Sequence, residues 1–413
     1  MTEHFDTVVL GGGASGMVAA VLSAEHKKKT LLIEKSNRLG RKIAASGNGR
    51  CNMMNSGPLK YYGNPNFAEN VIRNCGVEEL IRFFRHFGLL VKEEKEGRIY
   101  PVTMQSVSVL NMLQNAMKIN HVEVLLNTEI SCIQKKKNLF VCSTKDGKEY
   151  KSNRLIICTG GAAQKKLGGS FDGYQYLQSL GHHLNPVLPS LVPVVTDPKS
   201  ISGLKGIRVH CHISLFDGNT LLHREEGELL FTDNGLSGIC VMQCSRFINK
   251  KNLHFEIDLF SSVFSDPSDA LTEIKNRQKT FELYSPLMLL EGILLPKLSY
   301  AVLKQAGIPL KGESAGSLSE NDLEKIVWSA YHYTSKVIKT RTFDDAQVTA
   351  GGICSEEFDP QTMESRIVKG LFAAGEVLDI DGDCGGFNLM FAFSSGMIAG
   401  GFRNSSKFFP EET

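Results

Sequence analysis

Three glycines near the N-terminus have the spacing that lets a backbone bind a phosphate group. Gly11, Gly13 and Gly16 follow a short β-branched run and precede a stretch of small and apolar residues. The first glycine permits a tight turn, the second lets the backbone approach a pyrophosphate, and the third allows close helix–strand contact. Free N–H groups at the helix start, around Ala14 and Ser15, favour the negative charge. This stretch predicts a dinucleotide-binding turn.

A carboxylate closes the next apolar run. Glu34 stands where the second strand of a dinucleotide-binding unit ends, and its carboxylate is placed to accept hydrogen bonds from an adenosine ribose. The neighbouring Lys35 is included among the expected cofactor contacts. A turn that only packs, followed by a surface glutamate, is the alternative interpretation.

The loop that follows favours FAD over NAD. Residues 37–52 are rich in glycine and basic groups and contain few large apolar side chains, which suits a loop that wraps around a long cofactor. A loop without a ligand is the alternative. Arg50 has two candidate roles, binding an FAD phosphate, which we favour, or polarising a substrate oxygen. The expected contacts in this loop are Arg41, Lys42, Ser46, Gly47, Arg50, Cys51 and Asn52.

A second glycine-rich stretch lies near the C-terminus. Gly375 and Glu376 end an apolar run, and Gly386 precedes a small-residue helix that begins near Asn388. N–H groups at such a helix start favour the negative charge that develops at the N1–C2=O edge of a reduced flavin. The remaining expected cofactor contacts are Ile130, Thr159, Gly160, Gly161, Phe387 and Leu389.

These residues require a parallel sheet to position them. A strand, a glycine turn, a helix and a second strand within about thirty residues form a βαβ unit. From about residue 186 prolines become frequent, and alternating strand patterns continue to about 257. Helical patterns follow, with starts predicted at Asp266-Pro267 and at Ser319. Because the pattern of a strand followed by glycines returns at 347–352, we expect a cofactor domain in two pieces around an insert.

The composition excludes several classes of partner. With 413 residues and a formal net charge of +2, the chain has no strong basic footprint for nucleic acid or membrane surfaces. It has no apolar run of membrane-spanning length and no signal peptide pattern. The ten cysteines lack the spacing of a disulfide framework, which suggests reduced thiols and a cytoplasmic location. The clusters at 210–212, 240–244 and 379–383 lack complete ligand spacing, so we predict no metal.

The chain resembles the three-domain bacterial flavoproteins of the NAD(FAD)-utilising dehydrogenase family. The resemblance spans both ends of the chain and a shorter part of the middle. The middle departs from the family pattern at Asp233 and Ile239, where histidine and proline are frequent. The motifs that carry the resemblance lie at 11–16, 34–35, 39–42, 46–52, 97–101, 227–232, 235–238, 349–352, 375–379 and 385–389.

The resemblance implies an α/β fold, with a Rossmann-like FAD-binding domain that contains an inserted β-barrel-like domain and a small helical domain. We place the FAD-binding segments at 1–188 and 339–413, the barrel-like domain at 189–265 and the helical capping domain at 266–338. Members of the family act as 3-dehydro-bile-acid Δ4,6-reductases or as aminoacetone oxidases.

The leading functional hypothesis is therefore an FAD-dependent ene-reductase. It would transfer hydride from reduced flavin to the C=C bond of a 3-oxo-Δ4 or Δ4,6 bile-acid steroid, a small-molecule substrate, with NAD(P)H as transient electron donor. The alternatives are an amine oxidase of the aminoacetone type and a non-catalytic flavin redox sensor. The apolar segment 287–303 either lines a steroid groove or forms a helical core, the second being favoured. No catalytic residue, proton donor or oligomeric state follows from the sequence.

Overall fold

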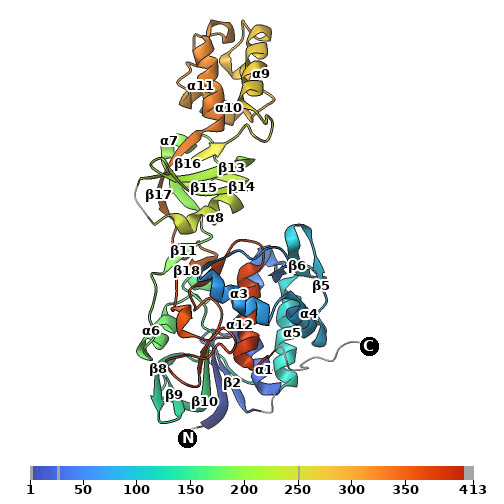
Figure 1. Ribbon diagram of the computed structural model, residues 1–413, viewed down its shortest axis with the longest axis vertical. Coiled ribbons are helices and arrows are strands. Elements are labelled where there is room, and N and C mark those ends of the chain that lie inside the picture. The colour runs from blue at the N-terminus through green and yellow to red at the C-terminus, as the bar shows by residue number, and fades with distance from the viewer. Residues whose placement is uncertain (1–2, 26–27, 250–251, 404–413) are drawn as a thin grey trace. The chain divides into compact units, whose positions relative to one another are not determined.

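The computed structural model describes residues 3–25, 28–249 and 252–403 (Figure 1). The chain divides into two compact units. One, called the Rossmann unit below, comprises residues 1–188 and 347–413, and the other, called the barrel unit, comprises 189–346. Residues 404–413 of the expected second FAD-binding segment lie outside the described part. The separate boundaries that we expect at 265 and 338 stay predictions.

The Rossmann unit is built on a seven-stranded sheet of order β7-β2-β1-β10-β9-β8, with β19 pairing to β10. Strands β7, β2, β1, β10 and β19 run parallel, whereas β9 is antiparallel to both β10 and β8. All four residues of β2 are buried, as expected for a parallel strand covered on both faces. The strands are β1 (Glu3–Leu10), β2 (Thr30–Ile33), β7 (Glu123–Leu125), β8 (Ile130–Lys136), β9 (Leu139–Thr144), β10 (Glu149–Ile157) and β19 (Leu371–Ala373).

Two helices made mostly of small and apolar residues lie against each other and join the two ends of the chain. They are α1 (Ala14–Glu25) and α12 (Phe387–Gly400). A Cβ atom on Gly396 would lie 2.5 Å from the Ser15 carbonyl oxygen, and one on Gly400 would lie 2.8 Å from that of Ala19. The glycines of α12 therefore let the two backbones touch, which fixes the C-terminal segment beside the N-terminal turn.

Shorter elements complete the Rossmann unit. Helix α3 begins where Pro65 occupies its first position and the Asn64 side chain accepts a hydrogen bond from the Phe67 N–H group. The elements are α2 (Arg41–Ala45), η1 (Ser46–Gly49), β3 (Met54–Asn55), β4 (Tyr61–Gly63), α3 (Pro65–Asn74), α4 (Val77–His86), β5 (Val91–Glu93), η2 (Lys95–Gly97), β6 (Arg98–Pro101), α5 (Ser106–Ile119), η3 (Lys165–Leu167), α6 (Asp172–Ser179), β18 (Val348–Ala350), η7 (Ser355–Glu357) and β20 (Ile380–Gly382). Strand β11 (Leu188–Ser190) includes the residue at which the first segment of this unit ends.

The barrel unit contains a closed barrel of order β12-β15-β14-β13-β16-β17. Alternate residues of β16 are buried, so one face of each strand fills the interior. Phe231, Phe255 and Ile257 belong to this core. The strands are β12 (Val194–Thr196), β13 (Arg208–Asp217), β14 (Thr220–Thr232), β15 (Gly235–Ser237), β16 (Leu253–Asp258) and β17 (Tyr333–Thr340).

Two helices of the barrel unit begin where the sequence predicts. Asp266 caps α9 by accepting a hydrogen bond from the Ser268 N–H group, and Ser319 forms a capping box at α11. The segment 287–303 mainly supplies core residues, among them Leu290, Leu298 and Val302, so the structure favours the helical-core interpretation. The helices are α7 (Pro198–Ile201), α8 (Ile239–Cys244), η4 (Ser245–Phe247), α9 (Pro267–Thr280), η5 (Pro286–Leu289), α10 (Pro296–Gln305), η6 (Ala315–Ser317) and α11 (Glu320–Tyr331).

The expected fold class is confirmed: a Rossmann-like α/β sheet, a closed barrel and a helical segment.

Candidate cofactor site

The glycine turn leaves open space at only one of its three motif positions. A Cβ atom on Gly11 would lie 2.4 Å from the Cys158 carbonyl oxygen, and one on Gly16 would lie 1.9 Å from that of Gly11. At Gly13, by contrast, a Cβ atom would meet nothing within 4 Å. Gly11 and Gly16 are therefore required by the fold itself. Gly13 borders space that the protein does not fill.

The Glu34 carboxylate supports this turn. One of its oxygens accepts a hydrogen bond of 2.7 Å from the Gly12 N–H group, and the other accepts one of 2.7 Å from the Ser36 N–H group. Each carboxylate oxygen keeps acceptor capacity, because an ionised carboxylate can accept about four hydrogen bonds. The side chain can thus hold the turn and accept from a ribose hydroxyl at the same time. Its neighbour Lys35 lies 3.0 Å from the Asp172 carboxylate.

The two basic residues at the start of the loop are held by protein partners. The Arg41 guanidinium donates to the Ser36 hydroxyl and the Lys166 carbonyl oxygen, while its buried Nε atom has no partner in the described structure. The Lys42 ammonium lies 3.1 Å from a Glu376 carboxylate oxygen. This ion pair brings together two expected cofactor contacts, one from each segment of the Rossmann unit.

The rest of the loop turns tightly. Ser46 donates its hydroxyl to the Ile43 carbonyl oxygen, and Gly47 has a positive φ of 55°. Cys51 is buried, and burial raises the pKa of its thiol to about 11, so it remains protonated. The buried side-chain oxygen of Asn52 has no partner in the described structure. Arg50 is exposed to solvent.

Residues from two strand ends meet beside the turn, because β1, β10 and β19 run parallel and end at the same edge of the sheet. Gly160 has a φ of +72°, and a Cβ atom there would meet nothing within 4 Å. A Cβ atom on Gly161 would lie 2.6 Å from a Glu376 carboxylate oxygen. Thr159 has a buried hydroxyl without a partner in the described structure, and Gly375 is held by a hydrogen bond from its N–H group to the Ser395 hydroxyl.

Helix α12 begins without a side-chain cap. Gly386 precedes it with a φ of +106°, in a position where a Cβ atom would lie 2.4 Å from the Met54 carbonyl oxygen. The Asn388 side chain instead binds the backbone of Gly382, accepting from its N–H group at 2.8 Å and donating to its carbonyl oxygen at 2.7 Å. Among the described residues, no side chain caps the first N–H groups of this helix. Phe387 is buried, and Leu389 is partly exposed.

Ile130 lies at the start of β8, and its carbonyl oxygen accepts a hydrogen bond of 2.6 Å from the Tyr176 hydroxyl. The strand reaches this point from beside Glu34, because the Thr128 N–H group donates to the Glu34 carbonyl oxygen. The backbone two residues before Ile130 is thus bound to Glu34, the residue that we expect to contact the ribose. Its role as a cofactor contact stays a prediction.

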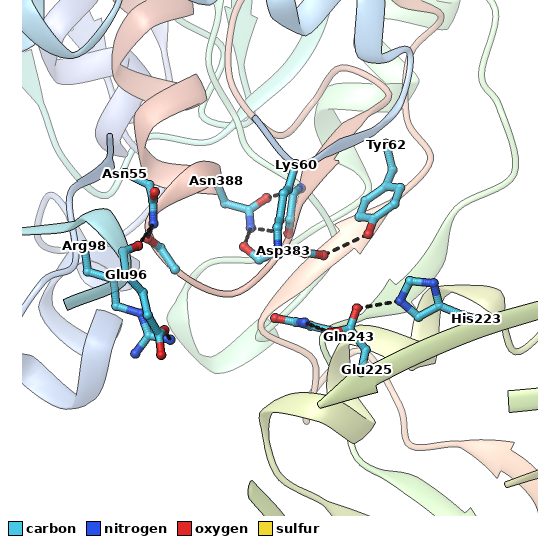
Figure 2. Close-up of polar contacts among 12 residues, drawn as sticks. Asn55, Lys60, Tyr62, Glu96, Arg98, His223, Glu225, Gln243, Asp383 and Asn388 are labelled. Atoms are coloured by element: carbon cyan, nitrogen blue, oxygen red, sulfur yellow. Dashed lines mark hydrogen bonds and ion pairs between the residues drawn. The ribbon is translucent and has the colours of Figure 1, made fainter. Parts of the chain in front are cut away.

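Sequence reasoning missed a polar group next to the start of α12 (Figure 2). The Tyr62 hydroxyl donates to a carboxylate oxygen of Asp383 at 3.0 Å, and the Lys60 ammonium lies 3.6 Å from the other oxygen. Asn55 donates to the carbonyl oxygens of Glu96 and Gly385. No signal in the sequence pairs residues 60–62 with 383, because the pairing depends on the contact between β4 and β20.

The residues present fit FAD. The Rossmann unit provides open backbone at Gly13 and Gly160, two buried oxygen atoms without partners at Asn52 and Thr159, and a helix start without a side-chain cap. These features are typical of a site that a phosphate-containing cofactor completes. Within the described ranges there is no group of three metal-ligating side chains. In the same ranges no helix is both long and apolar enough to cross a membrane.

The chain is similar along almost its whole length to curated proteins of two activities. It is 32% identical over 406 residues to the 3-dehydro-bile acid Δ(4,6)-reductase of Clostridium scindens, covering 95% of this chain and 97% of the relative. It is 29% identical over 399 residues to the ribosomal RNA dihydrouridine synthase of Escherichia coli, covering 95% and 96%. The corresponding protein of Haemophilus influenzae is 29% identical over 408 residues, covering 96% and 97%.

Residues 5–402 match the family model described as HI0933-like protein Rossmann domain. Together with the glycine turn, the supporting carboxylate and the two-segment site, this match shows that the chain belongs to the HI0933-like family of FAD-binding, FAD-dependent oxidoreductases.

Proposed function

We propose that the chain reduces a C=C bond conjugated with a carbonyl group, and that a 3-oxo-Δ4 or 3-oxo-Δ4,6 bile-acid steroid is its substrate. The observation that carries this proposal is the 32% identity to the C. scindens reductase, which extends over 95% of this chain. Similarity of that extent covers the barrel unit as well as the cofactor site. It therefore includes the part of the chain that we expect to select the substrate.

A uridine in ribosomal RNA is the second candidate substrate. It is favoured by the two dihydrouridine synthases, which match this chain over 95% and 96% of its length. The two activities share one chemistry, because dihydrouridine is formed by saturating a C=C bond that is conjugated with a carbonyl group of uracil. The expectation of no nucleic-acid partner rests on the net charge of +2 and stays a prediction.

The residues of the Rossmann unit have separable roles in this proposal. The N–H groups at the start of α1, beside Gly13, bind the pyrophosphate, and Glu34 accepts hydrogen bonds from the ribose. The first N–H groups of α12 would face the isoalloxazine N1–C2=O edge. Bound FAD, once reduced, supplies the hydride. We propose NAD(P)H as the electron donor. Because the sequence contains one complete dinucleotide turn, which FAD would occupy, NAD(P)H would bind only transiently.

The test is a pair of anaerobic half-reactions on the purified holoprotein. The flavin is first reduced by NADH or, if NADH fails, by dithionite, and a 3-oxo-Δ4,6 bile acid is then added. We expect the absorbance of oxidised flavin to return and the steroid mass to increase by two hydrogen atoms. The saturated 3-oxo steroid is the matched control and should leave the flavin reduced.

Two further arms separate the alternatives. Reoxidation by a uridine-containing ribosomal RNA fragment, with none by the steroid, would assign the second candidate. Reduction of the oxidised flavin by a primary amine such as aminoacetone would contradict both reductase assignments. A flavin that responds to none of these compounds would support a redox sensor.

A further inference from the structure

A short antiparallel pair places a tyrosine next to the start of α12. Strands β4 and β20 pair with Tyr62 opposite Asp381 and Tyr61 opposite Gly382. The same Gly382 is bound on both backbone groups by the side chain of Asn388, the second residue of α12. Tyr62 is thus tied through one hydrogen-bonded loop to the helix start that is expected to face the flavin (Figure 2).

The hydroxyl of Tyr62 belongs to a three-membered polar group. It donates to one oxygen of Asp383, whose side chain is 4% exposed, and Lys60 lies against the other oxygen with a side chain that is 55% exposed. The carboxylate therefore bridges a partly exposed phenol and an ammonium group in contact with solvent. A buried carboxylate with partners on both oxygens can transmit a proton between them.

Two other protonated side chains near the helix start, Tyr61 and Cys51, are buried, whereas Cys384 is partly exposed, as Tyr62 is. The neighbouring Tyr61 is 6% exposed, and its hydroxyl donates to the Phe387 carbonyl oxygen inside the unit. Cys51 is fully buried. Tyr62 is partly exposed and can reach a molecule that lies against the protein surface.

We propose that Tyr62 is the proton donor of the reduction, and that Asp383 and Lys60 are positioning residues that restore its proton. This inference rests on the proposed function and assigns a residue to the step that the function leaves open. As hydride reaches the β-carbon of the conjugated system, the Tyr62 O–H bond breaks and a C–H bond forms at the α-carbon. Lys60 returns a proton to the phenolate through the Asp383 carboxyl group, and the Lys60 amine is protonated again by solvent.

The decisive comparison uses two oxidants on the reduced holoprotein. The enone requires a proton at carbon, whereas ferricyanide removes electrons one at a time and requires none. In Tyr62→Phe we expect reoxidation by the enone to slow by about 10²- to 10⁴-fold, the usual contribution of a general acid. Reoxidation by ferricyanide and FAD content should equal those of the wild type. The matched control is Tyr150→Phe, the same change near the N-terminal end of β10, whereas Thr159 and Gly160 follow the C-terminal end of that strand. This variant should leave both rates unchanged.

Product labelling in D₂O separates the donor from its positioning residues. The wild type should place deuterium on one face of the α-carbon, and Tyr62→Phe should place it on both faces because water replaces the phenol. Asp383→Asn keeps an acceptor for Tyr62 but cannot carry a proton, so we expect slower enone reduction with one-face labelling retained. A merely structural role for Asp383 would not preserve the labelling while slowing only the enone.

Several results would overturn the assignment. Enone reoxidation in Tyr62→Phe at the wild-type rate would show that another group donates, and Cys384→Ser then tests the partly exposed thiol as the donor. Equal slowing with ferricyanide would show that Tyr62 acts on the flavin rather than on the substrate. A wild-type flavin that reacts with ferricyanide but not with enone or RNA would contradict the proposed function, and this inference with it.

Discussion

At the scale of single residues, the glycine turn contains positions that are required for different reasons. A side chain on Gly16 would collide with the Gly11 carbonyl oxygen at 1.9 Å, so this glycine is needed before any ligand binds. Gly13 has a φ outside the left-handed region and open space beside it. The fold tolerates a methyl group there, but that methyl group would collide with a pyrophosphate bound in the same space.

We therefore predict that Gly13→Ala and Gly16→Ala separate folding from cofactor binding. Gly13→Ala should leave the Tm of the FAD-free protein at or slightly above the wild-type value, since alanine has less backbone entropy to lose. Its Kd for FAD should rise roughly 10- to 100-fold, equivalent to about 1–3 kcal/mol of overpacking. Gly16→Ala should lower the Tm of the FAD-free protein.

Thermal unfolding of apoprotein and fluorescence titration with FAD measure the two effects. Wild-type FAD affinity in Gly13→Ala would show that the pyrophosphate lies elsewhere.

Which residues could be predicted from the sequence depends on how local their geometry is. The glycine turn and the position of Glu34 follow from spacing along one βαβ unit, so the sequence indicates them directly. The Lys42–Glu376 ion pair and the Tyr62–Asp383 hydrogen bond join residues more than 300 positions apart. Such pairs depend on tertiary contacts, and a single sequence carries no periodicity that reports them.

At the scale of elements, the small residues of α12 predict a helix but not its partner. Gly396 and Gly400 are spaced by one turn and face the backbone of α1 at Ser15 and Ala19. A helix whose surface is nearly all buried has no polar face to indicate its orientation. The capping residues Asp266 and Ser319 act locally, and this is why both helix starts were predictable.

The C-terminal end of α1 contributes a pH dependence to stability. Burial raises the pKa of Glu25 from 4.5 to about 7, and its negative charge also opposes the dipole at a helix C-terminus. The folded state therefore binds more protons than the unfolded state between these two values, so the free energy of unfolding falls as pH rises through this range. The stabilisation is complete below the lower value and lost above about pH 7.

We expect Glu25→Gln to remove this dependence. At about pH 8 it should increase the free energy of unfolding by on the order of 1 kcal/mol, less than the full shift implies because the side chain is partly exposed. At about pH 5 the gain should be much smaller. Denaturant unfolding at both pH values measures it, with the exposed Glu149→Gln as control. A gain of equal size at both pH values would attribute the effect to packing rather than to ionisation.

At the scale of the whole molecule, the sequence division between cofactor site and insert has a structural basis. Every expected cofactor residue lies within the Rossmann unit, from either segment of the chain. The barrel unit has a core of its own that extends from Val194 to Val337. The chain leaves and re-enters the Rossmann unit at neighbouring points, because the Asn185 N–H group donates to the Gly352 carbonyl oxygen at 2.9 Å. Prolines from residue 186 and the glycines at 351 and 352 mark the two junctions in the sequence, whereas the bounds that we expect at 188 and 339 stay predictions.

We predict that a chain in which residues 189–346 are replaced by a short glycine–serine linker still folds and binds FAD but does not reduce the enone. The close approach of residues 185 and 352 means that a short linker closes the gap with little strain. Because the barrel unit has a core of its own, its removal takes no residue away from the Rossmann unit.

The flavin spectrum of the purified shortened chain tests FAD binding. Reoxidation after dithionite reduction tests the two electron acceptors, ferricyanide and the steroid. Ferricyanide should reoxidise it and the steroid should not, and adding Gly13→Ala should lower the amount of bound FAD. A colourless or aggregated shortened chain would show that the Rossmann unit needs the insert to hold its cofactor. Full steroid reduction by that chain would instead place substrate selection in the Rossmann unit.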